Sequence, residues 1–320
     1  MKNLLVLLNL LFIASFAKAQ EINFSRIQDM AIWYNQSLKT DKNSAVKLNM
    51  RNVKYDGMMA YKSLSGMVEI PLLSAEGKEA EHSGYFSISA GGASDKSNEG
   101  ILSNTMGLFG ISYAIPVAPN ETYVAFGVQG SYFQSRLNIN GQPLFGDQFD
   151  QYGPVEGMTS GDRLAAGWSY NHFDINAGIS AFSNSQYNKW HVGASVMHIN
   201  KAYTDDAKSD DFRLNYLLSL QGGYKYITPQ NDYCAFYTTL NWQGKAIKHF
   251  FNVSFQKSIP GMDAGVGLGL GYRYEDALVP NVEFRYTKLM LSLGYDVNVS
   301  AFNPAGFKRN GTELAVKFYF

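Results

Sequence analysis

The feature that most constrains this chain is an alternation of apolar and polar side chains with a period of two residues. From Leu289 to Val299 every odd-numbered residue is leucine, tyrosine or valine, and most residues between them are polar or small. Residues 264–275 alternate in the same way, with a glycine at every second position as far as Gly271. Successive side chains of a strand point to opposite faces, so each segment predicts a strand with one apolar face.

Followed along the chain, this alternation predicts about fourteen strands, many of them about ten residues long. That length crosses a bilayer when the strand is tilted. The predicted strands span residues 43–53, 57–70, 84–92, 102–115, 121–136, 170–183, 189–199, 212–228, 232–243, 247–258, 264–275, 279–287, 289–299 and 310–320. No long helix and no linker interrupts them, so residues 20–320 are expected to form one domain.

The first 19 residues have the pattern of a secretory signal peptide. Lys2 precedes an apolar run, and Ala17-Lys18-Ala19 is a small-x-small cleavage site, so cleavage after Ala19 is expected. A transmembrane anchor is the alternative, but the run is short for a span. The formal net charge of the chain is zero, and removing two lysines with this segment leaves −2. No basic field for nucleic acid is therefore expected.

The composition favours a membrane barrel over its alternative, a soluble β-sandwich. The chain has 30 Gly, 21 Tyr and 21 Phe, and its one cysteine excludes an internal disulfide framework. Predicted connections alternate between short ones and long ones, the long ones at 93–101, 137–169, 200–211 and 300–309, as in outer-membrane barrels. The first external loop and the stretch 71–83 break that alternation. Because lipid tolerates no unpaired strand edge, we expect a closed, all-β, antiparallel barrel of about fourteen strands, with twelve or sixteen as alternatives.

The chain ends in a strand-like segment, residues 311–320, whose even-numbered side chains from Leu314 to Phe320 are apolar. We expect this strand to pair with the first strand and close the barrel. A terminal aromatic residue on a closing strand resembles the signal that the barrel-insertion machinery reads. Phe318 and Phe320 are therefore the candidate barrel-assembly signal.

Charged residues on the inner faces are the candidate lumenal residues, and internal pairing is the favoured interpretation over a substrate path. They are Arg51, Glu69, Arg273, Glu283, Arg285, Glu313 and Lys317. The glycine row from Gly265 to Gly271 leaves space beside the wall, which another segment can fill. Residues 20–42 and the long loop 137–169 are the two segments proposed to plug the lumen there.

The long loop also carries aromatic residues among carboxylates. Its candidate residues are Phe145, Asp147, Phe149, Asp150 and Tyr152. Exposed aromatic side chains of this kind suit a surface that binds a protein partner or cargo. A loop folded into the lumen is the equal alternative.

No pattern predicts catalytic, cofactor or metal-binding residues. The five histidines are scattered, and the acidic stretch 203–212 lacks the glycine and terminal glutamate of a calcium loop. Ser195 and His198 lie three apart, so they point to opposite faces of one strand. We therefore expect a protein that is not an enzyme and needs no cofactor.

Several stretches, taken in order, resemble the PorP/SprF family of outer-membrane proteins. They are "NFSRIQDMAIWYNQS" from residue 23, "KLNMRNV", "ISYAIPV", "VAFGVQGSY", "WHVGASVMHIN", "LSLGYDVNVS" and "GTELAVKFYF". The family's Asn-Pro-Ala stretch is replaced here by Asn35-Gln36-Ser37, so the chain resembles a diverged paralogue.

The resemblance implies an outer-membrane component of the type IX secretion system or gliding-motility machinery of Bacteroidetes. Such a component would dock or anchor secreted surface proteins, adhesins above all. The implied partners are outer-membrane lipid, the secreted cargo or adhesin, and other type IX secretion subunits, with no nucleic acid. A porin-like or hydrophobic-solute channel is the alternative function.

Overall fold

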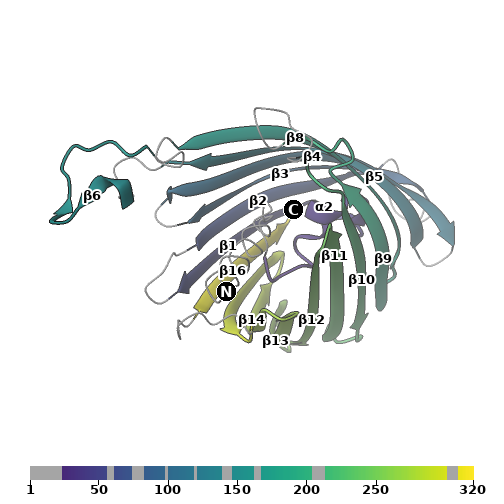
Figure 1. Cartoon of the computed structure of the whole chain (residues 1–320). Helices are drawn as coiled ribbons and strands as arrows, with labels where there is room; N and C mark the ends of the chain where they lie inside the picture. Colours follow the sequence, from purple (N-terminus) through teal and green to yellow (C-terminus); the bar gives the residue numbers. More distant parts are fainter. Residues whose placement is uncertain are drawn as a thin grey trace, which may run out of the picture.

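The computed structural model describes residues 24–55, 61–73, 83–97, 100–118, 121–138, 146–161, 167–203, 213–300 and 309–320. These residues form a closed barrel of fourteen antiparallel strands (Figure 1). The predicted fold class is therefore confirmed. In the same ranges, no helix is both long and apolar enough to cross a membrane.

The observed strands follow the predicted ones in number and order. The barrel strands are β1 (Ala45–Tyr55), β2 (Tyr61–Leu72), β3 (Tyr85–Ser97), β4 (Leu102–Ala118), β5 (Thr122–Leu137), β8 (Trp168–Asn184), β9 (Asn188–Met197), β10 (Leu217–Ile227), β11 (Tyr233–Gln243), β12 (Ala246–Ser258), β13 (Ala264–Arg273), β14 (Ala277–Tyr286), β15 (Leu289–Asn298) and β16 (Arg309–Tyr319). β6 (Phe149–Asp150) and β7 (Gly153–Pro154) form a separate two-stranded sheet. The largest differences are at β10, which begins later than predicted, and at β3, which extends to Ser97.

The closing pair joins the two ends of the chain. β1 pairs with β16 over its whole length, from Ala45 opposite Tyr319 to Tyr55 opposite Arg309. β16 also pairs with β15, and every other barrel strand pairs with its neighbours in sequence along the described chain. No barrel strand is left with a free edge, which is the condition for strands to cross lipid.

The two faces of the wall are inverted relative to a water-soluble protein. Large apolar side chains point outward, for example Leu268 at 65% exposure and Phe255 at 59%. Serine, asparagine and glutamine point inward and are buried, as at Ser89, Gln129 and Asn252. An apolar outside and a polar inside are typical of a transmembrane barrel, so the β-sandwich alternative is wrong.

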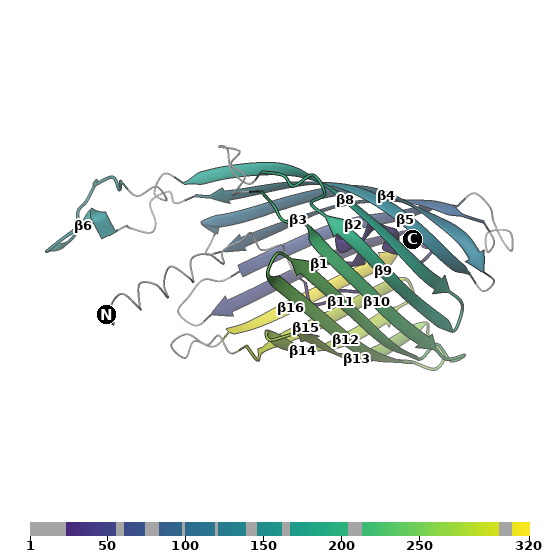
Figure 2. The same cartoon turned by 45° about the vertical axis from the view of Figure 1, so that its right-hand side comes forward.

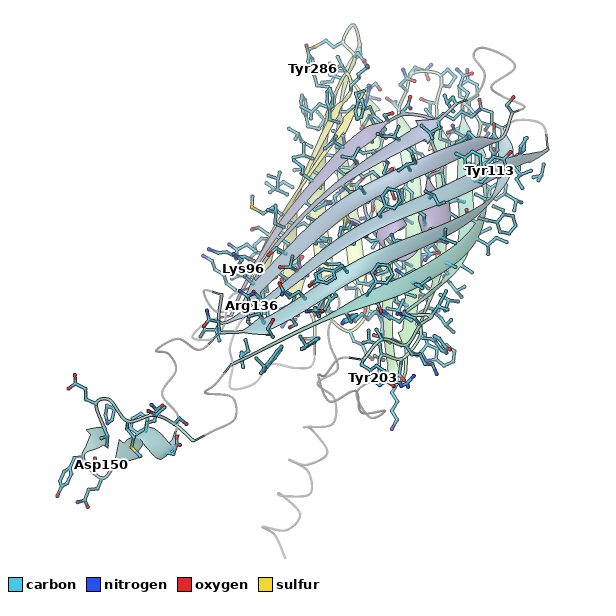
Figure 3. The ribbon with its side chains drawn as sticks, turned by 90° about the horizontal axis from the view of Figure 1, so that it is seen from above. Lys96, Tyr113, Arg136, Asp150, Tyr203 and Tyr286 are labelled. Carbon is cyan, nitrogen blue, oxygen red and sulfur yellow. The ribbon has the colours of Figure 1, made fainter. Side chains whose placement is uncertain are left out.

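The barrel has two distinguishable ends (Figure 2). The terminal end carries Ala45, Tyr319 and short connections such as those between β8 and β9 and between β14 and β15. The loop end carries the connections from β5 to β8 and from β9 to β10. The described part of the long loop, residues 146–161, lies outside the barrel beyond the ends of β5 and β8 (Figures 2 and 3).

Residues 24–40 lie inside the barrel and are called the plug. They include the helical turns α2 (Ala31–Tyr34) and η1 (Gln36–Leu38) (Figure 1). Phe24, Met30, Ile32 and Trp33 of the plug form an apolar cluster with wall residues. The wall residues of this cluster include Met67, Leu108, Met197 and Leu217. Of the two segments proposed to fill the lumen, the N-terminal one is therefore found there, and the described part of the long loop is not.

Candidate functional site

The tip of the plug rests on four wall glycines, which we call the glycine seat. A methyl group added at Gly178 of β8 would lie 2.1 Å from Asn35 Oδ1. Added at Gly110, Gly127 and Gly193, it would lie 2.4 Å, 2.6 Å and 2.8 Å from the nearest atom of the segment Asn35-Gln36-Ser37. The side chains of Asn35 and Gln36 and the backbone of Ser37 thus approach β4, β5, β8 and β9 to a distance that only glycine allows.

The glycine row of β13 was the predicted packing site, and that prediction is wrong. The atoms nearest to an added methyl group at Gly265, Gly267, Gly269 and Gly271 belong to the wall itself. They include side chains of Gln256, Glu283, Asn281 and Asn252, which are lumenal residues of the flanking strands. Large polar neighbours fill the space that the glycines leave.

Neutral hydrogen bonds hold the tip in the seat. Asn35 Nδ2 donates to Gln221 Oε1 at 3.1 Å, and Asn35 Oδ1 accepts from Ser37 N at 3.0 Å. Ser180 Oγ donates to Ser37 O at 2.8 Å, and Ser89 Oγ donates to Gln36 Oε1 at 2.7 Å. The hydroxyl and amide groups of the wall thereby bond to three consecutive residues of the tip, which contains no proline.

Charged groups hold the beginning of the plug on the other side of the barrel. The backbone N–H groups of Ser25 and Arg26 donate to the Glu313 carboxylate at 2.8–3.1 Å. The Arg26 guanidinium lies between Asp29 and Glu283, at 2.6 Å from each carboxylate. Burial raises the pKa of Asp29, but Arg26 outweighs this effect and holds the pKa below its usual value.

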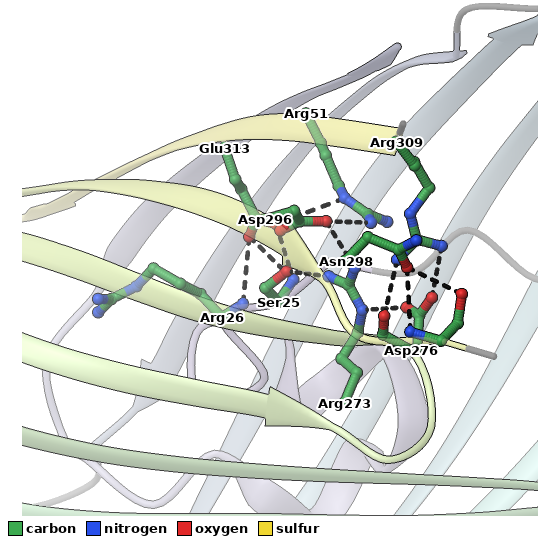
Figure 4. A network of polar contacts seen from close by, with 10 residues as sticks. Ser25, Arg26, Arg51, Arg273, Asp276, Asp296, Asn298, Arg309 and Glu313 are labelled. Carbon is green, nitrogen blue, oxygen red and sulfur yellow. Dashed lines mark hydrogen bonds and ion pairs between the residues drawn. The ribbon is translucent and has the colours of Figure 1, made fainter. Parts of the chain in front are cut away.

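A second set of charges, the arginine network, links β1, β13, β15 and β16 (Figure 4). Asp296 accepts from Arg51 at 2.7 Å and from Arg273, which also reaches Ser25 Oγ of the plug. Arg273 Nε lies 2.6 Å from Asp276 Oδ2, and Arg309 contacts the same carboxylate. Burial raises the pKa of Asp276, but Arg273 and Arg309 together lower it below its usual value. Through the contact between Arg273 and Ser25, the network ties the plug to these four wall strands.

Glu69 anchors the point where the plug leaves the lumen. Its carboxylate contacts Lys47 Nζ of β1 and lies 3.5 Å from Lys39 Nζ of the plug. Lys39 also lies 2.8 Å from Asp41. The side chains of Lys39, Lys47 and Glu69 are almost fully buried. The plug therefore ends in an ion cluster whose charges compensate one another.

The seven predicted lumenal residues all lie on inward-facing positions of their strands. Arg51, Glu69, Arg273, Glu283 and Glu313 are brought into the contacts with the plug or its network. Arg285 is not, because it pairs with Asp263 in an exposed turn. Lys317 is not either, because its ammonium group lies over the Tyr319 ring at 4.6 Å.

Sequence reasoning missed the partners that complete these clusters. They are Arg26, Asp29, Lys39, Lys47, Asp276, Asp296 and Arg309. Lys47 and Asp296 share the inward parity of Arg51 and Ser292, so the alternation itself was a usable signal for both. The plug residues follow no strand period, and that pattern therefore carried no signal for them.

The long-loop residues form a small exposed hairpin, residues 146–161, with β6 and β7 at its tip. Asp147 accepts from Ser160 Oγ and Gly161 N at 2.7 Å each, and these bonds lower the pKa of its carboxyl group. Asp150 Oδ1 accepts from Tyr152 N at 2.7 Å. Phe149 and Tyr152 are 48% and 88% exposed. Phe145, the remaining predicted residue, lies outside the described residues.

The candidate assembly residues lie at the very end of the closing strand. Phe318 and Phe320 both point outward, with 46% and 55% of their surface exposed. Phe320 N donates to Ser44 O at 3.1 Å, so the last residue is tied to the residue that directly precedes β1. Among the described residues, no group of three or more histidine, cysteine or acidic side chains is arranged to hold a metal ion.

Solved structures with a similar fold are outer-membrane barrels. The toluene transporter TbuX of Ralstonia pickettii aligns with a TM-score of 0.52 at 9% identity, covering 91% of this chain and 93% of the transporter. The deltaS2S3 mutant of the monoaromatic hydrocarbon channel TodX gives 0.54 at 8% identity, covering 90% and 93%. A FadL homologue of Pseudomonas aeruginosa gives 0.52 at 7% identity, covering 89% and 92%. At these identities the likeness shows the fold alone.

The sequence comparisons identify the family. No curated protein matches the chain. The family model of the type IX secretion system membrane protein PorP/SprF matches residues 60–318, which covers all but the first of the barrel strands. The match begins after the plug, so it leaves the replaced Asn-Pro-Ala stretch untouched. The fold and the family match together show that this chain belongs to the PorP/SprF family of type IX secretion membrane proteins, which are outer-membrane barrels.

Proposed function

We propose that this protein docks or anchors secreted surface proteins, adhesins in particular, at the outer membrane, and that it does so without catalysing a reaction. The observation that carries this proposal is the plug. A lumen filled by a segment of the same chain, with a charged anchor and a glycine seat, suits a fixed platform better than an open pore.

The exposed hairpin of residues 146–161 is the surface proposed to meet the cargo. It projects from the loop end of the barrel (Figure 3). Its Phe149 and Tyr152 side chains are exposed and present aromatic surface. Its fold is held by its own hydrogen bonds, from Ser160 and Gly161 to Asp147 and from Val155 N to Gln148 O. A pre-formed hairpin with aromatic side chains loses little conformational entropy when it binds a partner.

A capture experiment from outer membranes tests this proposal. The affinity-tagged protein should recover an identified secreted surface protein, and Phe149→Ser with Tyr152→Ser should reduce that recovery severalfold. Met262→Ser is the matched control, because Met262 is equally exposed at 57% but lies in a turn at the terminal end. Recovery of no secreted surface protein, or equal recovery by the hairpin variant, would argue against docking.

A channel for hydrophobic solutes is the second candidate function, and the fold favours it specifically. TbuX and TodX, which share the architecture, are a toluene transporter and a monoaromatic hydrocarbon channel. The cavity between the plug and the wall does not favour a hydrophobic solute, because lysine, acidic, serine and threonine side chains form much of its lining. Steady single-channel conductance, together with normal display of surface proteins in a deletion strain, would support the channel.

We also propose that export removes residues 1–19. The apolar run and the Ala17-Lys18-Ala19 site support cleavage after Ala19. The intact mass of the protein purified from outer membranes tests this, because the mature chain should begin at Gln20.

A further inference from the structure

A cavity of about 200 Å³ lies between the plug and the wall. Its lining includes Asn184, Ile227 and Tyr319, the last strand residues before the turns and the terminus, so it extends to the rim of the terminal end. Four lysines from separate strands also line it: Lys47 of β1, Lys189 of β9, Lys225 of β10 and Lys317 of β16. We call it the lysine cavity.

The register of the wall places like charges directly opposite each other in this cavity. Lys189 is the cross-strand partner of Lys225, and Lys317 is the cross-strand partner of Lys47. Side chains at such positions have Cβ atoms roughly 5 Å apart, and like charges there are destabilising. Two such pairs around one cavity need compensation by negative charge.

The acidic residues of the lining supply only part of that compensation, because each already contacts another cation. Asp29 pairs with Arg26, and Asp41 pairs with Lys39. Glu69 contacts Lys39 and Lys47. Glu283, the fourth carboxylate of the lining, pairs with Arg26 at 2.6 Å.

Among the described residues, the direct contacts of Lys189, Lys225 and Lys317 are neutral, and carboxylates such as Asp29 and Asp41 act on them only at longer range. Lys189 Nζ donates to Asn184 Oδ1 at 2.8 Å. Lys225 Nζ lies 3.6 Å from the centre of the Tyr233 ring, and Lys317 Nζ lies 4.6 Å from that of Tyr319. Each ammonium group has three donors, so every one of them retains donors for a ligand.

We propose that the lysine cavity binds a small multivalent oxyanion of the phosphate type, independently of any docking function. Lys189, Lys225 and Lys317 line the same cavity without a direct ion pair, and lysine binds phosphate as a point charge. The cavity is smaller than the roughly 300–1,000 Å³ typical of pockets for larger organic ligands. The ligand is therefore free phosphate or a single phosphoryl group that enters from the terminal end.

Calorimetry on the full-length protein in detergent tests the site, with inorganic phosphate as the probe and sodium chloride at matched ionic strength as the reference. Phosphate should bind saturably at one site, and Lys225→Gln and Lys189→Gln should each weaken binding about tenfold or more. Lys257→Gln is the control, because that side chain is 86% exposed on β12 and should leave binding unchanged. Glycerol 3-phosphate distinguishes the two possible ligands. If it binds more tightly than inorganic phosphate, the ligand is a phosphoryl headgroup. If it binds more weakly, the ligand is the free anion.

Thermal unfolding gives a second readout in case a variant folds poorly. Phosphate should raise the unfolding midpoint of the native protein, since a ligand that binds only the folded state stabilises it. The same addition should leave the midpoint of Lys225→Gln unchanged. Absence of saturable phosphate binding by the native protein would overturn the proposal, and so would binding by both lysine variants that is as tight as that of the native protein.

Discussion

On the side of β4, β5, β8 and β9 the plug contacts glycines, hydroxyls and amides, whereas on the side of β13 to β16 it contacts arginines and carboxylates. The first region is defined by shape, because a single added methyl group would meet plug atoms. The second is defined by charge, because each buried ion there is matched by a counter-ion. The comparison teaches that one short segment is held by two kinds of interaction that different substitutions will separate.

The largest effect is expected when the charged side loses its central cation. Arg26→Met leaves Asp29 and Glu283 buried without their guanidinium, and breaking a buried pair costs about 3–5 kcal/mol. We expect the plugged state to lose stability by that amount, measured as a shift in denaturant unfolding. Arg285→Met is the matched control, because its partner Asp263 is exposed and such pairs contribute about 1 kcal/mol or less. Equal losses for both variants would contradict the buried role of Arg26.

A smaller loss is expected when the glycine seat is overfilled. Gly178→Ala places a methyl group against Asn35, and forcing extra volume into a packed site costs about 1–3 kcal/mol. Protease accessibility of the plug should rise together with this loss. Gly107→Ala on β4 is the control, since no atom lies within 4 Å of the added methyl group. If the plug of Gly178→Ala is as resistant to protease as that of Gly107→Ala, the steric explanation of the glycine seat is wrong.

Lowering the pH should weaken the charged contacts of the plug and leave its contacts with the glycine seat intact, without any substitution. The pKa of Asp29 is held below its ordinary value of 3.8, so its contribution to stability is complete above that value and is lost as the pH falls through the lowered pKa. Hydrogen-exchange protection of the Ser25 and Arg26 amides should therefore hold from pH 7 down to about pH 3.8 and fall as the pH is lowered further. The Ser37 amide, which is bonded to Asn35, should keep its protection. A parallel loss at all three amides would show that the plug is released as one unit.

The smallest effect on the plug is expected from the chain terminus. Deleting Phe320 removes an outward-facing ring and the hydrogen bond to Ser44, neither of which contacts the plug. The amount of protein in the outer membrane should fall, while the protease resistance of the plug in the assembled fraction should stay unchanged. Immunoblots of outer-membrane fractions measure the first quantity. Undiminished levels would exclude Phe320 as part of the assembly signal.

Much of the wall was predictable because lipid imposes a strict period of two. Leu293 and Tyr295 had to face outward and Asp296 inward, and the structure places them so. Parity also placed Arg285 and Lys317 on the inner side. It could not say that Arg285 would pair within a turn, since partners depend on strand register and on the plug.

The plug itself was predictable only as a segment, because its contacts follow no period. The isolated glycines Gly127 and Gly178 were the true signal of close backbone approach. The row from Gly265 to Gly271 was more conspicuous but misleading, because glutamine and asparagine side chains from neighbouring strands occupy the space beside it. Whether a glycine makes room for a distant segment or for its neighbours is decided by tertiary packing.

The most direct test of this account is the single-channel conductance of the native protein beside a variant that lacks residues 24–40, both reconstituted in planar bilayers. A barrel closed by its own N-terminal segment predicts that the native protein is silent or nearly so, and that the deletion variant conducts in large, steady steps. Equal conductance from the native protein and the deletion variant would contradict the central claim that the plug fills the lumen.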